Sequence, residues 1–536
     1  MADAEEFDYV VVGGGTAGCI LANRLTACGR HTVLVLEAGA QGRSPWIPIP
    51  AGFSRLLTHR GYNWGFQSEP EDNVCGRRIA IPRGKGLGGS TLINGMIYVR
   101  GQPGDYDRWA ALGAAGWSHA DVAPYFEKIE NTRVGGPGRG RSGPMHIAEV
   151  SERFPIAEAF LAAAEQDGQP RNADYNGAGQ AGFGYYQVCQ RDGRRWSAAD
   201  GYLAPARRRP NLHVRTHAHA TQLLLEPGRC VGVRYRRGDG STAQARARRQ
   251  VVLAAGAVQS PHLLELSGIG DPQVLQAAGI PVRHALPGVG GNYIDHYATR
   301  MNWRVQGAAT LNEGTRGLPL AAAVARYCLR RKGILTLGTG LAFGFVKTRP
   351  ELATPDVQYF FMHASYADAA VRRLDRMPGM TIGVAQLRPE SVGSIHAAGP
   401  DPMAPPRIRP NLLASPADQA CLVAGMRIAR RIVGQPAMRR HVQAELNPGE
   451  QVQSDAQWLD FARRNGQTIY HPIGTCRMGA DDRAVVDPRL RVRGLDGLSV
   501  VDASVMPAMV SGNTQAAVMM VAEKGADILL EDARRN

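Results

Sequence analysis

The sequence contains no pair of cysteines at the spacing used by metal sites or dithiol redox centres. Its eight cysteines are scattered along the chain, and none belongs to a C-x-x-C motif. A structural zinc site needs clustered Cys or His ligands, and a thioredoxin-like centre needs two neighbouring thiols. We therefore expect buried free thiols and no bound metal.

Long apolar runs are missing as well. No segment approaches the ~20 consecutive apolar residues that cross a bilayer as a helix, so no membrane span is expected. The first ten residues, MADAEEFDYV, lack the basic region, apolar stretch and small-residue cleavage site of a secretory signal. A cytoplasmic location is the expectation that follows.

Lysine is scarce, because only 5 of the 62 basic residues are lysine. The net charge of +15 therefore comes from arginines, which occur in pairs and triplets along the whole chain, as at residues 207–209 and 463–464. A nucleic-acid-binding protein concentrates its positive charge on one face or one helix. The dispersed pattern favours a solvated arginine-rich surface, and no nucleic-acid partner is expected.

A strand–helix–strand pattern begins the chain. Residues 8–12 are a β-branched apolar run typical of a buried strand, residues 19–26 have a helical pattern, and residues 32–36 form a second apolar run. Between the first strand and the helix lies the G-x-G-x-x-G turn GGGTAG, at residues 13–18.

Each glycine of that turn has a physical role. Gly13 allows the tight turn, Gly15 lets the backbone approach a pyrophosphate, and Gly18 lets helix and strand pack closely. Glu37 follows the second strand, where a carboxylate accepts hydrogen bonds from the adenosine ribose. The pattern predicts an adenine-dinucleotide site but does not distinguish FAD from NAD.

Further strands of the same unit lie far along the chain. Residues 251–254 form a buried-type strand, and we expect the next helix to start with Ser260 as its N-cap and Pro261 in its first position, and to end at Gly268. Residues 498–501 form a strand with Asp502 at its carboxyl end, the edge where open α/β sheets bind ligands.

The middle of the chain has a different pattern. Residues 357–362 and 380–387 alternate as the strands of an antiparallel sheet do. We therefore predict an α/β protein (α+β overall), with a Rossmann-like dinucleotide domain and a second, antiparallel-sheet substrate domain. A chain of 536 residues is too long for one compact core. The expected boundaries are 1–155, 206–295 and 466–536 for the dinucleotide domain, 156–205 for a mixed substrate-side segment, and 296–465 for the substrate domain.

Four segments, taken together, resemble the glucose–methanol–choline (GMC) oxidoreductases. The first is the glycine turn with Glu37, and the second is RGKGLGGSTLING at residues 83–95, which is similar to the family's first signature. The third is GAVQSPHLLELSGIG at residues 256–270, which matches the second signature. The fourth combines YHP at 470–472, VDAS at 501–504 and NT at 513–514. The resemblance implies an FAD cofactor, a Rossmann-like FAD-binding domain and an antiparallel-sheet substrate domain.

The resemblance also implies which residues hold FAD. It places Thr16, Ala17 and Glu37 at the ADP portion and Ala220 at the adenine. The pyrophosphate, ribityl chain and flavin ring are expected to meet Gly89, Ser90, Asn94, Gly95, Met96, Ile97, Asp502 and Ala503. Ala38, Thr514 and Gln515 complete the expected site. Trp64 is a further candidate from its aromatic character, which fits a place near the cofactor and a place in the core equally well. Family members that attach FAD covalently use a histidine just before the signature asparagine; here that residue is Ile93, so we expect non-covalent FAD.

The catalytic pair of the family corresponds to His471 and Asn513. Alcohol oxidation needs a base, a hydride acceptor and stabilisation of the charge on the reduced flavin. Histidine suits proton transfer near neutral pH, and Asn513 can bind the same oxygen and orient the alcohol. The apolar helix expected from Thr514 to Leu530 starts beside Asn513, so its dipole can favour the anionic reduced flavin. A lone histidine is usually a satisfied buried one, and we expect that role for His296.

The predicted reaction is oxidation of an alcohol to an aldehyde or ketone, with hydride transfer to flavin N5 and His471 as base. The electron acceptor is oxygen, in an oxidase, or a quinone-type molecule, in a dehydrogenase. The family also contains hydroxynitrile lyases, so cyanohydrin cleavage without net redox chemistry is the alternative. The sequence leaves open which alcohol is used, the choice between oxidase and dehydrogenase, and the oligomeric state.

Overall fold

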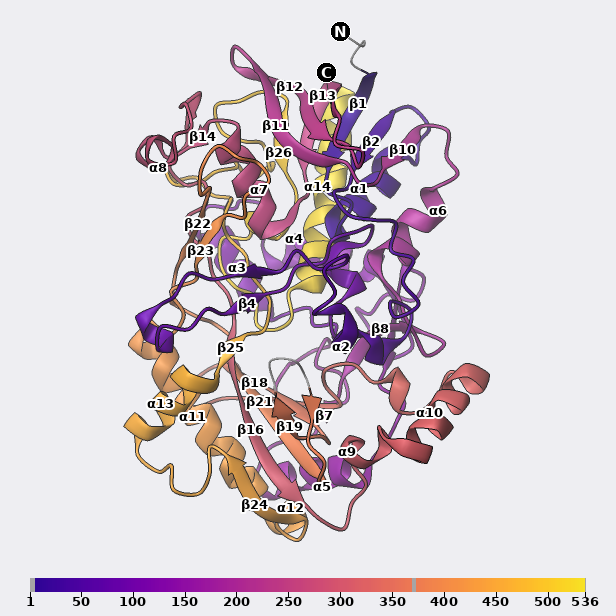
Figure 1. The fold of residues 1–536 in the computed structure, drawn as a ribbon, viewed down its shortest axis with the longest axis vertical. Coiled ribbons are helices and arrows are strands. Elements are labelled where there is room, and N and C mark those ends of the chain that lie inside the picture. Colours follow the sequence, from indigo (N-terminus) through magenta and orange to yellow (C-terminus); the bar gives the residue numbers. More distant parts are fainter. Residues whose placement is uncertain (1–4, 369–372, 536) are drawn as a thin grey trace.

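Two large sheets, one above the other along the long axis, organise the molecule (Figure 1). The computed structural model describes residues 5–368 and 373–535. The upper sheet contains the first strands of the chain, and the lower sheet is built from strands between Gly182 and Thr468. This arrangement confirms the predicted fold class, a Rossmann-like unit joined to an antiparallel sheet.

The upper sheet has a parallel core. Strands β10 (Leu212–Arg215), β2 (Val33–Leu36), β1 (Glu5–Val12), β13 (Thr242–Leu253) and β26 (Leu498–Val500) lie in that order, all parallel. Their apolar runs are buried because helices cover them, as parallel strands require. Helix α1 (Thr16–Thr26) makes the predicted crossover from β1 to β2. The antiparallel strands β12 (Arg229–Arg236) and β11 (His219–Glu226) extend the sheet beyond β13.

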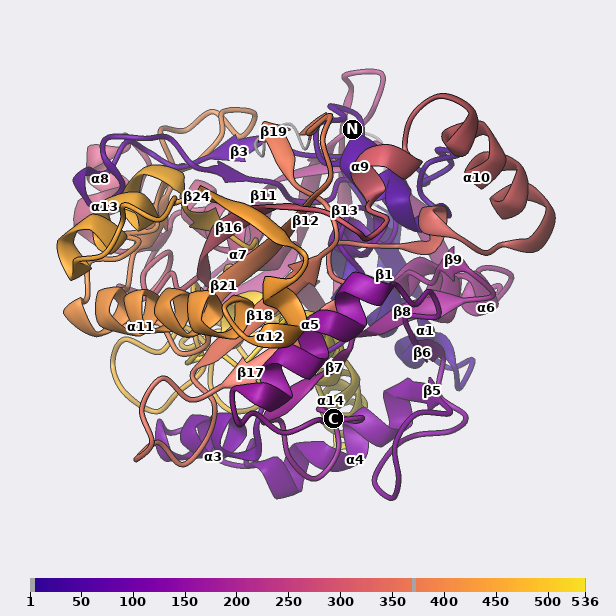
Figure 2. The ribbon, with the colours of Figure 1, turned by 90° about the horizontal axis from the view of Figure 1, so that it is seen from below.

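The lower sheet is antiparallel throughout. Its strand order is β24 (Val442–Asn447), β16 (Tyr297–Val305), β21 (Gly379–Gln386), β18 (Val357–Met362), β17 (Ala342–Val346) and β7 (Gly182–Tyr185), and β25 (Gln467–Thr468) also pairs with β16. The long helices α11 (Pro416–Val433) and α5 (Pro155–Gln166) pack on this sheet and on each other (Figure 2). The other face is therefore free to meet the upper unit.

A buried carboxylate fixes the last helix, α14 (Gln515–Arg535), against α1. Glu523 is fully buried and accepts hydrogen bonds from the Arg24 guanidinium (2.7 Å) and the Tyr202 hydroxyl (2.8 Å), with the Lys128 ammonium 3.0 Å away. Burial opposes ionisation, but the Arg24 hydrogen bond holds the pKa of Glu523 below its usual value. The N-termini of α1 and α14 consequently lie on the same side of the molecule.

The remaining elements are shorter and surround these two units. The other helices are α2 (Phe53–Leu56), α3 (Pro103–Ala111), α4 (His119–Ile129), α6 (Ala204–Ala206), α7 (Gly256–Leu266), α8 (Pro272–Ala277), α9 (Leu311–Gly314), α10 (Gly317–Arg330), α12 (Pro436–Arg439) and α13 (Asp455–Asn465). Short strands include β5 (Glu130–Thr132), β6 (Met145–Glu149), β8 (Gln187–Arg191) and β9 (Arg194–Arg195). In the described part of the chain no helix has the length and apolar content needed to cross a membrane.

The cysteines only partly follow expectation. All eight are free, and Cys19, Cys189, Cys230 and Cys476 are buried. Three others, Cys28, Cys75 and Cys328, are exposed, so the prediction of uniformly buried thiols is wrong. Within residues 5–368 and 373–535, no cluster of His, Cys, Asp or Glu has the geometry of a metal site.

Helix α7 starts earlier than the sequence predicts. It begins at Gly256, so Ser260 is not its N-cap and Pro261 lies inside it. A proline in a helix leaves the carbonyl four residues earlier without its usual donor. Here the Ala257 carbonyl instead accepts a hydrogen bond of 2.7 Å from the hydroxyl of Thr475. This long-range bond explains why the proline is tolerated, and Gly268 (φ +80°) follows the helix end as expected.

We therefore predict that Thr475→Val lowers the free energy of unfolding by about 1 kcal/mol, because the buried Ala257 carbonyl loses its donor. In a Pro261→Ala background the same substitution should cost much less, because residue 261 then supplies the missing N–H. Chemical denaturation of the four proteins of this cycle measures the coupling. Equal costs in both backgrounds would contradict the interpretation.

Candidate active site

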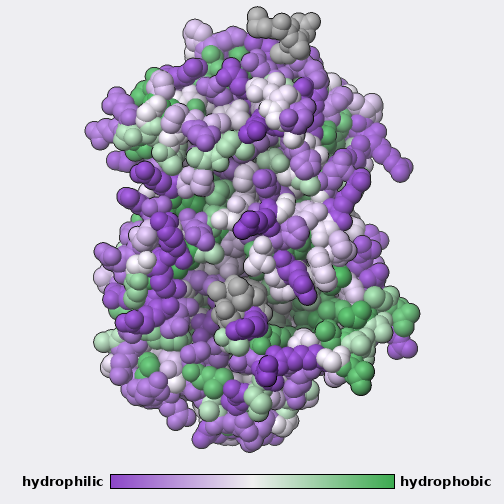
Figure 3. Space-filling model, in the orientation of Figure 1, coloured by the Kyte–Doolittle hydropathy of each residue, from purple (hydrophilic) through white to green (hydrophobic). Residues whose placement is uncertain are grey.

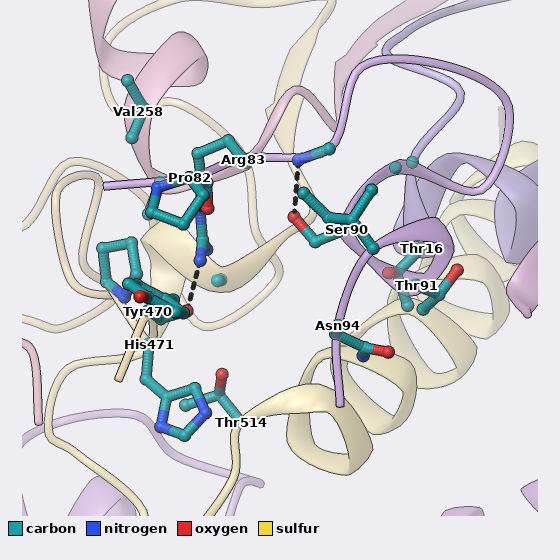
Figure 4. A pocket seen from close by; sticks show the side chains of 18 of the residues that line it. Thr16, Pro82, Arg83, Ser90, Thr91, Asn94, Val258, Tyr470, His471 and Thr514 are labelled. Carbon is teal, nitrogen blue, oxygen red and sulfur yellow. Dashed lines mark hydrogen bonds between the residues drawn. The ribbon is translucent and has the colours of Figure 1, made fainter. Parts of the chain in front are cut away.

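A single cavity takes its walls from both sheets. It is lined by the segments that follow β1, β2 and β26, by strands β16, β18 and β21, and by the start of α14. In Figure 4, His471 and Thr514 lie side by side, with Asn94 and Thr16 further along the wall. All but one of the predicted site residues line the cavity: Gly13, Gly15, Thr16, Ala17, Glu37, Ala38, Trp64, Gly89, Ser90, Asn94, Gly95, Met96, Ile97, Ala220, His471, Asp502, Ala503, Asn513, Thr514 and Gln515.

The exception is Gly18, which lies beneath the glycine turn. A Cβ atom there would stand 1.9 Å from the Gly13 carbonyl oxygen, so its role is close packing of helix on strand. Gly13 has φ +104°, and a Cβ atom on it would come within 2.6 Å of the Ala254 carbonyl oxygen. Both positions require glycine for steric reasons.

Gly15 borders the cavity instead. A Cβ atom on it would make only ordinary contacts, at 3.8 Å from the Gly89 Cα and 4.0 Å from the Ala254 carbonyl oxygen. Helix α1 begins directly after it, with no side-chain cap and no acidic residue in its first turn. The unpaired N–H groups and the positive end of the helix dipole therefore point at this space, which fits a pyrophosphate. Gly89 (φ +54°) closes the far side, where a Cβ atom would stand 2.7 Å from the Gly15 Cα.

Glu37 bridges two loops at one end of the cavity. Its Oε2 accepts a hydrogen bond from the Gly14 N–H (2.8 Å), and its Oε1 accepts one from the Gly39 N–H (2.7 Å). Burial raises the pKa of Glu37, and the two backbone donors act against that rise. Each oxygen keeps an acceptor site for a further donor such as a ribose hydroxyl.

Ala220 and Trp64 line the same end of the cavity. Ala220 lies on β11, and its neighbour His219 contacts the edge of the Trp64 ring at 5.4 Å. The Trp64 ring also stacks on Phe66 at 5.7 Å, and the Lys85 ammonium lies 4.4 Å from its centroid. Trp64 thus packs with protein groups on several sides while it borders the cavity.

Asn94 connects the signature segment to the start of α14. Its Nδ2 donates a hydrogen bond to the side-chain oxygen of Gln515, the first residue of that helix. Its Oδ1 accepts from the Met96 N–H (3.1 Å) and from Arg195 (2.9 Å). Met96 has φ +66°, a region that non-glycine residues rarely adopt, and the bond to Asn94 helps to hold it there.

Asp502 is fully engaged by protein donors. Its carboxylate accepts hydrogen bonds from the Gly256 N–H (2.8 Å), the Ser260 hydroxyl (2.6 Å), and the N–H (2.8 Å) and hydroxyl (2.6 Å) of Ser504. Burial raises the pKa of Asp502, and these bonds oppose that rise. It therefore ties the end of β26 to the start of α7 at the cavity wall.

His471 and Asn513 meet at the other end of the cavity. The Nε2 atom of His471 is 3.2 Å from the Nδ2 atom of Asn513, and the His471 Nδ1 atom is 3.0 Å from the Nδ1 atom of His296. The two residues come from the loop after β25 and the loop before α14, which are separated by 42 positions in the chain.

A backbone carbonyl sets the tautomer of His471. The Nε2 atom of His296 is 2.9 Å from the Leu387 carbonyl oxygen, which can only accept, so His296 carries its proton on Nε2. Its Nδ1 atom is then an acceptor and receives the Nδ1 proton of His471. The Nε2 atom of His471, which faces Asn513, is left with its lone pair.

A second carbonyl sets the orientation of Asn513. The Tyr186 hydroxyl donates to the Tyr359 carbonyl (2.9 Å), so its oxygen accepts from the side-chain amide of Gln358 (2.9 Å). The same amide nitrogen donates to the Asn513 Oδ1 (3.2 Å). The Nδ2 group of Asn513 is consequently the end that points to His471.

The backbone before His471 is held from both sides. Tyr470 has φ +72°, which is unfavourable for a bulky residue, and its carbonyl accepts a hydrogen bond from the Arg83 guanidinium (Figure 4). The buried Asp295 carboxylate accepts the His471 N–H (2.8 Å) and the Thr468 hydroxyl (2.5 Å). Burial raises the pKa of Asp295 to about 6.

The surroundings keep the imidazoles neutral. Burial lowers the pKa of His471 well below its usual range, and the neighbouring His296 and the Arg83 cation lower it further. Burial also lowers the pKa of His296 to about 4. His471 is therefore an unprotonated base at neutral pH, and its lone pair meets the Asn513 amide at the cavity wall.

Sequence reasoning missed several residues of this network. His296 is buried and hydrogen-bonded, as expected, but nothing in the segment NYIDH (292–296) predicts that its partner is His471. Arg83 belongs to the first signature but was not singled out. Gln358 and Tyr186 lie in strand-like segments, and only the folded sheet brings their side chains to Asn513.

Comparison with known proteins places these features in a family. A model described as GMC oxidoreductase matches residues 7–298, and a second model with that description matches residues 389–522. The chain is 40% identical over 528 residues to an oxygen-dependent choline dehydrogenase of Rhizobium etli, covering 98% of this chain and 95% of the relative. It is 38% identical over 531 residues to an alcohol dehydrogenase [acceptor] of Pseudomonas putida, covering 98% and 96%.

A solved structure agrees with these matches. The formate oxidase of Aspergillus oryzae, studied for modification of its FAD, superposes with a TM-score of 0.91 at 26% identity and full coverage of both chains. The family models cover most of the sequence, and the relatives align along nearly all of it. The chain belongs to the GMC oxidoreductase family.

Proposed function

We propose that this protein oxidises an alcohol to an aldehyde or ketone with FAD as cofactor. The observation that carries the proposal is the pairing of His471 Nε2 with Asn513 Nδ2, 3.2 Å apart at the cavity wall, with both groups fixed in orientation from behind. A lone pair beside an N–H donor suits an alcohol oxygen, which donates its proton to one and accepts a hydrogen bond from the other.

The residues around the glycine turn would hold the FAD. The part of the cavity beside Gly15 and the start of α1 suits the pyrophosphate, Glu37 suits the ribose, and Asn94 to Ile97 with the start of α14 would border the flavin ring. When bound, FAD supplies the atom that accepts the hydride, N5. The N-terminus of α14 has no acidic residue in its first turn, so its dipole favours negative charge next to it.

His471 acts as the base in this proposal. It takes the hydroxyl proton at Nε2. Its own proton stays on Nδ1, from which it donates a hydrogen bond to the Nδ1 atom of His296. Asn513 holds the same oxygen and fixes the direction of the C–H bond. The lowered pKa of His471 keeps its lone pair available at neutral pH, although it also limits its strength as a base.

The described walls favour a neutral alcohol. At the catalytic end the cavity is bordered by Phe360, Met362, Thr299, Thr381 and Gly383 from the lower sheet. Among described residues the only carboxylates that line the cavity are Glu37 and Asp502, both engaged by backbone donors. A cationic alcohol such as choline would find no free counter-charge there.

The relatives favour net oxidation over the lyase alternative. Those compared above are named as dehydrogenases or as an oxidase, and no observation in the cavity points to cyanohydrin cleavage. The electron acceptor, oxygen or a quinone-type molecule, is decided by experiment.

The first test is anaerobic mixing of the FAD-loaded protein with a panel of alcohols while the flavin absorbance is followed. We expect bleaching by neutral primary or secondary alcohols and much slower bleaching by choline. Admission of air then separates an oxidase, which recolours promptly, from a dehydrogenase. Absence of bleaching by every alcohol would contradict the proposed reaction.

His471→Ala should slow flavin reduction by roughly several hundred-fold or more, within the ~10²–10⁴ usual for a general base. Stopped-flow reduction at saturating alcohol measures that step directly. His262→Ala is a suitable control, because His262 also lines the cavity but its hydrogen-bond partner is Gln259, and the described residues show no bond from it to His471 or Asn513. Reduction of His471→Ala at the wild-type rate would remove this residue from the role of base.

The pH dependence of kcat/KM should reflect the lowered pKa of His471. The base is active when unprotonated, so activity should stay level as the pH falls through the ordinary histidine value of 6.5 and decline only below it. A decline centred at or above 6.5 would show that the free enzyme holds His471 in an ordinary aqueous environment. The same profile should be absent from the residual activity of His471→Ala.

FAD should be released when the holoprotein is denatured in acid, because Ile93 replaces the attaching histidine. We expect yellow supernatant and colourless protein after precipitation, and no flavin fluorescence on a denaturing gel. Flavin that stays with the precipitated chain would show covalent attachment through another residue.

A further inference from the structure

Helix α10 (Gly317–Arg330) exposes two leucines on the side opposite its anchor. Leu318 and Leu329 are 85% and 84% exposed, whereas Tyr327, on the opposite side of the helix, is the buried residue that anchors it. Three turns separate Leu318 from Leu329, so both lie on one face together with Ala322. Figure 3 shows this helix as an apolar projection at the edge of the molecule. A surface helix normally has the opposite orientation.

Positive charge surrounds this face. The segment from 316 to 332 contains Arg316, Arg326, Arg330, Arg331 and Lys332 and no acidic residue. Arg326 has a distant partner in Glu152 (3.7 Å), and Arg331 lies over the Tyr327 ring. Among described residues, Arg330 and Lys332 form no ion pair.

An exposed tryptophan lies in the segment against which α10 packs. Trp46 is 41% exposed, and the Arg55 guanidinium lies 5.2 Å from its ring. Its segment lies next to α10, because the Tyr327 hydroxyl approaches the carbonyls of Pro48 (3.4 Å) and Gly193 (3.2 Å). We call the surface formed by α10, residues 331–332 and Trp46 the α10 face.

We propose that the α10 face binds the surface of an anionic phospholipid bilayer. Its composition is that of interfacial helices, which bury an apolar face among the acyl chains, place Lys and Arg at the headgroups, and have a Trp at the boundary. The helix lies in the plane of the membrane and does not cross it.

A second copy of this chain fits the face poorly. A two-fold contact places the same patch against itself, which would bring the arginines and Lys332 of both copies together without any acidic residue on α10 to neutralise them. Phosphate headgroups supply that neutralising charge. The proposal does not depend on the reaction assigned above.

Vesicle sedimentation tests the proposal. The FAD-loaded protein should sediment with vesicles of phosphatidylcholine and phosphatidylglycerol and much less with phosphatidylcholine alone. Leu318→Ser with Leu329→Ser should weaken binding at least about tenfold, because two leucines no longer enter the bilayer. Arg330→Gln with Lys332→Gln should weaken it by about fivefold for each charge removed.

Matched variants elsewhere control for general effects. Leu112→Ser with Val282→Ser alters two other exposed apolar residues, and Arg236→Gln with Arg237→Gln removes two charges from the hairpin between β12 and β13. Both should bind vesicles like the wild type. All variants should keep the wild-type melting temperature, because every altered side chain is exposed.

Three results would overturn the proposal. These are no sedimentation with anionic vesicles, equal binding to both vesicle types, and α10 variants that bind as well as the controls. If equilibrium ultracentrifugation instead shows a dimer that the Leu318→Ser and Leu329→Ser variants dissociate, without vesicle binding, the face belongs to a second copy.

Discussion

Two backbone carbonyls of the lower sheet determine the polarity of the catalytic pair. The Leu387 carbonyl fixes the proton on His296 and, through it, the tautomer of His471. The Tyr359 carbonyl fixes Tyr186, Gln358 and finally the amide of Asn513. A carbonyl cannot reverse its role, so neither chain of hydrogen bonds can run in the other direction. The base lone pair and the amide donor are therefore paired with each other at the cavity wall, in fixed orientations, before any substrate arrives, which lowers the cost of orienting them during reaction.

The upper sheet supplies the complementary half of the site. Its glycine turn and the start of α1 present N–H groups, and the start of α14 presents a second positive helix end to the same cavity. The buried Glu523 cluster keeps α1 and α14 in fixed relation, so the two helix ends do not move independently. The cofactor and the catalytic pair are thus positioned by one rigid junction of the two sheets, although they come from segments hundreds of positions apart.

The charged side chains on the outer surface fall into two groups with different surroundings. Many arginines elsewhere form ion pairs, such as Arg430 with Glu445 and Arg489 with Asp532. The α10 face differs because its basic residues lie beside exposed leucines. The combination of positive charge and exposed apolar area, and not positive charge alone, identifies this face as a binding surface.

Local patterns, namely strand and helix periodicity, glycine spacing and short family signatures, were enough to predict the fold class, the glycine turn and many, though fewer than half, of the residues that line the cavity. They failed where the cause was distant. Helix α7 contains Pro261 only because Thr475 supplies a donor from another segment, and His296 contacts His471 only because β16 and β25 pair in the lower sheet. Boundaries of the predicted domains stay a prediction. Only the tertiary structure decided the tautomer of the base, the orientation of Asn513 and the outward turn of α10, because each is set by contacts between residues far apart in the chain.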